Sequence, residues 1–261
     1  MTHIIAVANQ KGGVGKTTTA VNLAASLAAT KRRVLLVDLD AQGNATMGVG
    51  VDKYKLKVTT RDVLLEQAPT ADGIQFLSAL GFSILPANAD MTEAEIKLRE
   101  MAAGDFALKL ALEQVEGQFD YVLLDCPPAL SKLTVNAFVA ADGVLIPMQC
   151  EYYALEGLTA LVDTIQKIKR VINPKLEIEG LLRTMFDPRN NLSNDVSAQL
   201  LQHFGDKVYR SIVPRNVRLA EAPSHGLPAI SYDPLSAGAK AYLALAGEVL
   251  RRHDGGQIAL D

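Results

Sequence analysis

The sequence has few of the features that would mark a secreted or membrane protein. Only two of its 261 residues are cysteines, Cys126 and Cys150, and both lie in apolar surroundings. We therefore expect buried, reduced thiols and no disulfide scaffold. No apolar run reaches the roughly 18 residues of a membrane span. The first apolar segment begins almost at Met1, so no signal peptide is expected. These absences favour a soluble, cytoplasmic protein.

The chain also has little net charge and few aromatic side chains. The formal net charge is −3, and aromatic residues make up 5% of the chain. Without net positive charge there is no global attraction for nucleic acid, so any such contact must come from a local patch. Hydrophobic residues reach 49%, mainly Ala, Leu and Val, which suits helices packed on a parallel sheet.

The most informative stretch is a glycine-rich turn at residues 9–19, which reads Asn-Gln-Lys-Gly-Gly-Val-Gly-Lys-Thr-Thr-Thr. It follows a predicted strand at residues 4–8 and precedes a predicted helix at residues 20–29. In this context successive backbone N–H groups can surround a phosphate chain at a helix N-terminus. The residues expected to bind phosphate in this turn are Gly12, Gly13, Val14, Gly15, Lys16, Thr17 and Thr18.

Two side chains of this turn have distinct tasks. Lys16 supplies an ammonium for the outer phosphates, and Thr17 supplies a hydroxyl for Mg²⁺. The ordinary phosphate-loop pattern has glycine five positions before Gly15, where this chain has Gln10, and the chain adds a second lysine, Lys11. A tight loop that needs positive φ would explain the glycines. It would not explain two lysines and three threonines.

Carboxylates follow two further predicted strands. Residues 33–39 form an apolar run, with Asp38 and Asp40 at its end. Residues 119–125 form another, which ends at Asp125 before Cys-Pro-Pro. The carboxyl ends of parallel strands border the ligand crevice, so these side chains are expected there. Taken alone, Asp38 is explained as well by a structural role, as an N-cap or as the buried partner of a lysine, as by a role in the crevice.

Together, Lys16, Thr17, Asp40 and Asp125 predict a site for a Mg²⁺–nucleoside triphosphate, with Thr17, Asp40 and Asp125 toward the metal. Catalysis at such a site is mostly positioning and charge stabilisation, and Asp40 is the candidate for orienting the attacking water. Since Lys16 already serves the outer phosphates, Lys11 has no obvious task in its own subunit. A cation arriving across a two-fold interface would act as an arginine finger does.

Strands and helices alternate along the whole chain, without linker, repeat or low-complexity tract. We predict one α/β domain with a mainly parallel sheet covered on both faces, and a flexible tail at residues 253–261. Residues 143–146 are expected to form a strand that ends at Pro147, and Thr92 is expected to cap a helix, with Glu95 three residues on. Further strands are predicted at residues 82–86, 178–186 and 208–213, and helices at residues 58–66, 91–116 (broken at 104–105), 154–172, 193–204 and 236–252.

The motifs Lys-Gly-Gly-Val-Gly-Lys-Thr, Asp-Leu-Asp-Ala-Gln-Gly-Asn and Leu-Leu-Asp-Cys-Pro-Pro together resemble the ParA/Soj/MinD class of deviant Walker ATPases. Residues 213–226 are similar to the chromosomal ParA/Soj branch. The resemblance implies a three-layer P-loop NTPase fold, and ATP and Mg²⁺ as cofactors. It also implies ATP-dependent sandwich dimers, sequence-neutral DNA binding and a ParB-type partner that stimulates hydrolysis.

The family's residue roles carry over by position. Lys11 becomes the signature lysine that reaches the partner's ATP, and Gly12 lies where two phosphate loops approach. Asp40 positions water, and Asp125 belongs to the second switch. Pro214 and Asn216 match the family's nucleotide-base region.

For DNA, the resemblance points to Arg189 and Arg218. They lie within residues 183–218, where six basic and three acidic residues leave a local charge of +3. The alternative is an ordinary solvated charged face. Two such patches in a dimer would favour salt-sensitive backbone contacts and a nucleoid location. The chain has no N-terminal helix-turn-helix extension, so specific operator binding is not expected.

Four rival functions are weighed against this one. A MinD-like membrane-positioning ATPase should end in a basic amphipathic helix, whereas residues 251–261 are broken by glycines. An iron–sulfur ATPase needs two interface cysteines, and the motifs expected around them are missing. A metabolic ligase of the dethiobiotin synthetase type needs a small-molecule pocket. A ParA relative that positions another cargo, such as a chemotaxis cluster, remains open.

Overall fold

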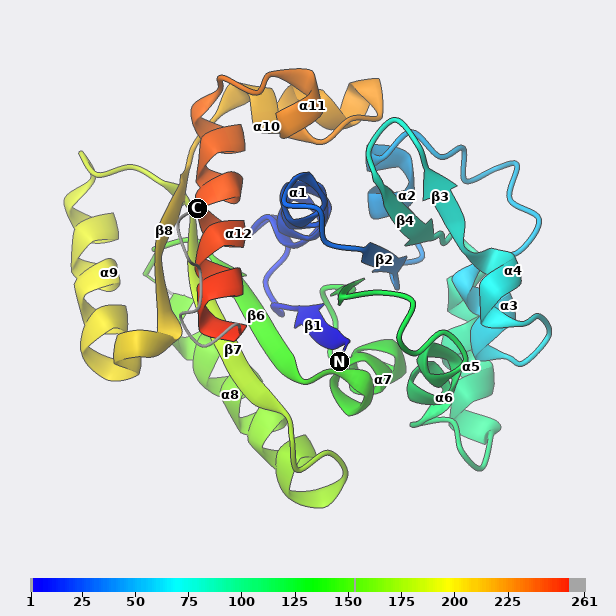
Figure 1. The fold of residues 1–261 in the computed structure, drawn as a ribbon. Coiled ribbons are helices and arrows are strands. Elements are labelled where there is room, and N and C mark those ends of the chain that lie inside the picture. Colours follow the sequence, from blue (N-terminus) through cyan, green and yellow to red (C-terminus); the bar gives the residue numbers. More distant parts are fainter. Residues whose placement is uncertain (1, 153, 254–261) are drawn as a thin grey trace.

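The computed structural model describes residues 2–152 and 154–253. Over these residues eight strands form one sheet in the order β3-β4-β2-β5-β1-β6-β7-β8. All neighbouring pairs are parallel except β3 and β4. The predicted α/β class, a mainly parallel sheet with helices on both faces, is confirmed (Figure 1).

The bounds of the elements follow the predicted alternation. The strands are β1 (His3–Val7), β2 (Val34–Asp38), β3 (Gln75–Leu77), β4 (Phe82–Leu85), β5 (Tyr121–Asp125), β6 (Gly143–Met148), β7 (Glu177–Phe186) and β8 (Val208–Pro214). The α-helices are α1 (Lys16–Ala29), α2 (Asn44–Gly48), α3 (Thr60–Leu64), α4 (Thr70–Gly73), α5 (Met91–Glu100), α6 (Ala107–Glu113), α7 (Lys132–Ala140), α8 (Ala154–Val171), α9 (Asn191–Phe204), α10 (Val217–Glu221), α11 (Ala229–Tyr232) and α12 (Ala237–His253). Short 3₁₀ turns are η1 (Gly205–Lys207) and η2 (Ala222–His225).

Alternate side chains of the central strands enter two hydrophobic cores, because successive residues of a strand point to opposite faces. Ile5 and Val7 of β1 pack in the core that contains residues of α1 and α12. Ala6 packs in the core that contains residues of α7 and α8. Figure 1 shows these two pairs of helices on opposite sides of the sheet. Burial on both faces explains the unbroken apolar runs of β2 and β5.

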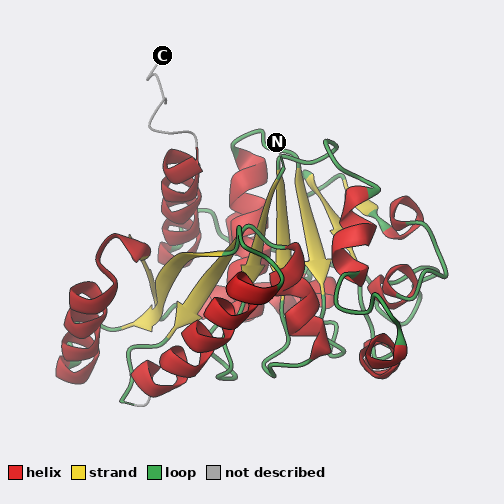
Figure 2. Cartoon of the chain, turned by 90° about the horizontal axis from the view of Figure 1, so that it is seen from below, coloured by secondary structure: helices red, strands yellow, loops and turns green. Residues whose placement is uncertain are grey.

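Because the central strands are parallel, their carboxyl ends meet at one edge, and Figure 2 shows them pointing the same way. Val7, the last residue of β1, lies beside Asp125 of β5, and Asp38 of β2 lies on the other side of Asp125. The sheet therefore brings the glycine-rich turn after β1 next to two strand-ending carboxylates. The amino ends of the strands meet at the opposite edge.

Two strands differ from expectation. The antiparallel strand β3 has only three residues, none of them fully buried, and carries too little apolar pattern to be predicted. Strand β6 continues through Pro147 to Met148, because its pairing with β1 has ended at Leu145 and the missing N–H of Pro147 has no partner there to lose.

The predicted N-cap at Thr92 is wrong. Helix α5 begins earlier, at Met91, because Asn88 already turns the chain by accepting hydrogen bonds from the backbone of Asp90 and Met91. A capping box forms instead at Thr59 and Asp62 of α3. Residues 254–261, most of the predicted tail, lie outside the described residues, and His253 is the last residue of α12.

Candidate functional site

The turn at residues 9–15 is a cradle of backbone that depends on glycine. Gly13 and Gly15 have φ of +74° and +88°, in the left-handed region, and Gly15 is the N-cap of the 14-residue helix α1. A Cβ atom at Gly12 or Gly13 would meet nothing within 4 Å, so the space over the turn is open. The N–H groups of the first turn of α1 are available to an anion there.

Tertiary hydrogen bonds fix the shape of this turn. Thr184, near the end of β7, donates its hydroxyl hydrogen bond to the carbonyl of Val14 at 2.8 Å, and both residues are buried. Asn9 donates to the carbonyl of Pro147 at 2.8 Å and accepts from the backbone N–H of Lys11 at 3.0 Å. The cradle is thus held by β6 and β7 before any ligand arrives, which reduces the ordering cost of binding.

Lys16 points into the turn from the start of α1. Its side chain is largely buried, and its Nζ donates to the carbonyl of Lys11 at 3.1 Å. Burial lowers the pKa of this ammonium, while the nearby carboxylates of Asp125 and Asp40 oppose that shift. Lys16, Asp40 and Asp125 therefore lie in one electrostatic neighbourhood, as the sequence predicts.

Asp125 is fully buried at the end of β5, and neither of its carboxylate oxygens has a hydrogen-bond partner among the described residues. Burial and the neighbouring Asp38 raise the pKa of Asp125 well above its ordinary value, and the side chains of Thr17 and Lys16 oppose the shift. An unpaired buried carboxylate is costly unless a cation or its water shell satisfies it. Together with the Thr17 hydroxyl it forms an oxygen-donor set that fits a hydrated Mg²⁺.

Asp38 is also fully buried, and its carboxylate holds the first turn of α2 from outside that helix, whose N-cap residue is Gly43. Its Oδ2 accepts from the backbone N–H and the hydroxyl of Thr46, in the first turn of α2, at 2.9 and 2.7 Å. The Thr46 hydroxyl oxygen in turn accepts from the N–H of Ala87 at 2.9 Å. Burial raises the pKa of Asp38 to about 6, although the hydrogen bonds from Thr46 oppose the shift.

We predict that Asp38→Ala lowers the free energy of unfolding by about 2–3 kcal/mol, because it leaves the N–H and hydroxyl of Thr46 buried without their acceptor. Urea denaturation at neutral pH measures the change. Asp163→Ala, on an exposed position of α8, is the control and should change stability by less than about 0.5 kcal/mol. Equal stability of the two variants would show that Asp38 does not hold α2.

Asp40 begins the loop between β2 and α2. Its Oδ1 accepts from the backbone N–H of Gln42 at 3.0 Å, and its own N–H donates to Asp38 at 3.1 Å. The side chain is half-buried, and its charge acts on Lys16 and Asp125, which places it near the glycine-rich turn. Gly43, with φ of +61°, closes the loop beside the carbonyl of Ala87. The loop thus places a carboxylate beside the cradle.

Lys11 lies on the outer surface of the turn and does not point into it. Its Nζ forms an ion pair with Glu151 at 2.5 Å, and the side chains are 45% and 52% exposed. An exposed pair of this kind contributes about 0.2–1 kcal/mol, so little energy opposes its release. The sequence reasoning missed Glu151, which follows β6 and carries no motif of its own.

Pro214 and Asn216 line a cavity of about 190 Å³ beside the phosphate-binding turn. The same cavity is lined by Gly15 and Thr18, and by Thr184 and Met185 at the end of β7. The Asn216 side-chain oxygen accepts from the N–H of Leu219 at 3.3 Å and caps α10. Residues from both halves of the chain therefore meet beside the turn.

The two arginines expected to contact DNA are exposed but already paired within the chain. Arg189 binds Asp187 at 2.8 Å. Arg218 binds Glu221 at 2.8 Å and Asp233 at 3.2 Å. Arg183, which contributes to the local positive charge, is buried and donates to Ser197 and the carbonyl of Tyr209. The positive charge available at the surface is thus smaller than the count along the sequence.

Comparison with known proteins tests the resemblance. A family profile described as an AAA domain matches residues 2–178. The chain is 50% identical to the chromosome partitioning protein ParA of Caulobacter vibrioides (strain NA1000 / CB15N) over 252 residues, 96% of this chain and 94% of that protein. It is also 50% identical to the sporulation initiation inhibitor protein Soj of Bacillus subtilis (strain 168), over 95% of this chain and 98% of that one. The chain belongs to the ParA/Soj family.

A solved structure shares the fold of this chain. A Mycobacterium smegmatis protein described as cobyrinic acid a,c-diamide synthase, with bound ADP and magnesium, is 38% identical. It superposes with a TM-score of 0.86 over 98% of this chain and 97% of its own. No helix in residues 2–152 or 154–253 is long and apolar enough to cross a membrane. Residues 251–261, whose sequence differs from the basic amphipathic end expected of a MinD-like ATPase, lie mostly outside the described residues.

Proposed function

We propose that this ParA/Soj-family chain is a Mg²⁺-dependent ATPase that dimerises when it binds ATP, holds DNA without sequence preference and drives chromosome or plasmid partitioning with a ParB-type partner. The chromosome-partitioning name of its ParA relative at 50% identity supports this role. We assign it to the cytoplasm, in association with the nucleoid.

The observation that carries the proposal is the different placement of two lysines in one turn. Lys16 is buried and faces inward, whereas Lys11 is exposed and held only by a surface ion pair with Glu151. A lysine on the outer face cannot serve the phosphates in its own cradle without rearrangement. It can reach a nucleotide in a second copy that approaches over the open space at Gly12.

The remaining residues divide the work of the site. Backbone N–H groups of residues 12–18 bind the phosphates, Lys16 neutralises their charge, and Thr17 and Asp125 hold the magnesium with its water shell. When bound there, Mg²⁺ would supply stabilisation of the negative charge on the phosphate groups. Asp40 orients the attacking water, and Lys11 of the second copy stabilises the charge that develops in the transition state. Pro214 and Asn216 border the base.

DNA binding requires arginines to exchange partners. Arg189 and Arg218 pair with carboxylates at present, and phosphate groups compete for them because a guanidinium binds both in bidentate fashion. A dimer presents each arginine twice, so affinity rises with dimerisation and falls steeply with salt.

The experiment that tests this function measures the mass of the protein in solution with ATP and with ADP, and then its binding to nonspecific duplex DNA at two salt concentrations. We expect a dimer with ATP–Mg²⁺ and a monomer with ADP. Only the ATP-bound dimer should bind DNA. Arg218→Ala should weaken DNA binding by about 10-fold and reduce the salt dependence, with dimerisation intact.

Arg99→Ala is the matched control, since Arg99 is an exposed arginine paired with Glu95 on α5. It should leave DNA binding unchanged. A protein that stays monomeric with ATP would contradict the proposed function. Equal DNA binding by Arg218→Ala and Arg99→Ala would reject only the DNA surface.

A further inference from the structure

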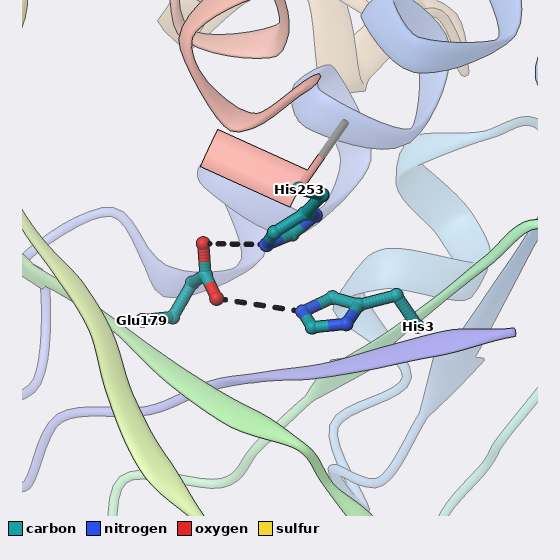
Figure 3. Close-up of side chains that lie close together, drawn as sticks. All are labelled: His3, Glu179 and His253. Atoms are coloured by element: carbon teal, nitrogen blue, oxygen red, sulfur yellow. Dashed lines mark hydrogen bonds and ion pairs between the residues drawn. The ribbon is translucent and has the colours of Figure 1, made fainter. Parts of the chain in front are cut away.

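A second cluster of chemically active side chains lies far from the phosphate-binding turn, at the edge where the strands begin. His3 comes from the start of β1, Glu179 from β7 and His253 from the last turn of α12. Figure 3 shows both imidazole rings turned toward the one carboxylate. The family motifs do not include these residues, and none of the roles proposed above uses them.

The distances within the cluster are short. His3 Nε2 lies 3.4 Å from Glu179 Oε2, and His253 Nε2 lies 3.0 Å from Glu179 Oε1. The two ring centroids are 3.7 Å apart. One potential ligand atom from each residue can be chosen so that all three lie within 4.8 Å of one another. In a tetrahedral zinc site with bonds of about 2.0–2.1 Å, neighbouring ligand atoms are about 3.3 Å apart.

The second nitrogen of each ring also faces a polar group. His253 Nδ1 lies 3.1 Å from the hydroxyl of Tyr121, and His3 Nδ1 lies 3.9 Å from Asp142 Oδ2. Outer partners of this kind hold metal-binding histidines in the required tautomer. When Nδ1 carries the ring proton, each Nε2 presents a lone pair toward a carboxylate oxygen, and a bound cation can then link the two in place of a hydrogen bond.

The three side chains of the cluster are largely removed from solvent. The Glu179 side chain is 9% exposed, and those of His253 and His3 are 17% and 29% exposed. A cavity of about 680 Å³, lined by all three residues and open to solvent, provides access and room for a water ligand.

We propose that His3, Glu179 and His253 form a binding site for a divalent transition-metal ion of the zinc type, with a water molecule as fourth ligand. Two imidazoles and one carboxylate are the donor set that Zn²⁺ and Co²⁺ accept and that Mg²⁺ disfavours. The ion joins the end of α12 to β1 and β7, three segments that meet only in the folded chain. Binding therefore stabilises the native state.

The test uses the full-length protein, stripped of metal with a chelator and kept in excess Mg²⁺ without nucleotide. Co²⁺ is the probe, because four-coordinate Co²⁺ absorbs visible light far more strongly than the octahedral ion expected at an oxygen-donor Mg²⁺ site. We expect one equivalent of Co²⁺ per chain to give this absorption, Zn²⁺ to abolish it, and Zn²⁺ to raise the melting temperature.

Variants assign the signal to the cluster. His253→Gln and Glu179→Gln should remove the absorption and the thermal shift, and Tyr121→Phe, which removes an outer partner, should weaken Co²⁺ binding about 10-fold. His203→Gln is the control, since His203 is exposed on α9. His253→Gln alters only the last residue of α12, so it keeps the test valid if Glu179→Gln fails to fold.

Two results would overturn the proposal. Absence of four-coordinate absorption in the unaltered protein would show that the three side chains form only a metal-free ionic cluster. Equal absorption in His253→Gln and His203→Gln would place the ion elsewhere. The outcome does not depend on ATP binding, dimerisation or DNA, so it can fail while the proposed function stands.

Discussion

Lys16→Ala should lower the affinity for ATP by at least about 100-fold. In the proposed site the Lys16 ammonium binds the phosphates from a largely buried position, and each hydrogen bond from a charged donor is worth about 1.5–3 kcal/mol. Every later step depends on the nucleotide, so dimerisation and DNA binding should disappear as well. Titration calorimetry with ATP and Mg²⁺ measures the first effect, and light scattering measures the second.

Lys109→Ala, an exposed lysine of α6, is the control for a general loss of positive charge. It should bind ATP as the unaltered chain does. A circular dichroism spectrum of Lys16→Ala should match that of the unaltered chain, since the substitution removes a desolvated charge and leaves only a small gap. Nucleotide-dependent DNA binding retained by Lys16→Ala would refute the assignment of the phosphate site.

Asp40→Ala should separate binding from hydrolysis. The Asp40 carboxylate lies beside the cradle but is not part of the turn that surrounds the phosphates, so ATP affinity should change little. Loss of the group that orients water should slow hydrolysis by about 100-fold or more. Because the ATP-bound form then persists, the variant should accumulate as a dimer and remain on DNA.

Asp52→Ala provides a closely matched control. Asp52 Oδ1 accepts from the N–H of Tyr54 at 3.0 Å, which is the same type of turn that Asp40 forms with Gln42. Asp52 does not neighbour Lys16 or Asp125. Phosphate release and solution mass, measured for both variants with ATP–Mg²⁺, distinguish a catalytic role from a loop effect. Normal turnover by Asp40→Ala would show that another group positions the water.

The two experiments also distinguish the parts of the proposed function. If Lys16→Ala loses ATP but Asp40→Ala does not accumulate as a dimer, the chain is a nucleotide-binding protein in which Lys11 has no partner to reach. If both behave as expected, the exposed position of Lys11 and its weak pair with Glu151 are explained by the proposed contact of Lys11 with the nucleotide of a second copy.

Much of the site is predictable from the sequence because its pieces are local. The glycines of the turn, Lys16 and Thr17 are contiguous, and a strand followed by a helix fixes their arrangement. Asp38 and Asp125 could be placed near the turn because parallel strands end at a common edge, and the register of β1, β5 and β2 agrees. The short strand β3 was missed, since three residues carry too little pattern.

Contacts between distant segments were decided only by the tertiary structure. Thr184 holds Val14 across 170 positions, and Lys11 meets Glu151 across 140. The cluster of His3, Glu179 and His253 likewise forms only because β1, β7 and α12 meet at one edge of the sheet. Local patterns carry backbone preference and burial, which determine the elements and the phosphate-binding turn. Which side chains then face each other depends on strand order and helix packing, which no single segment encodes.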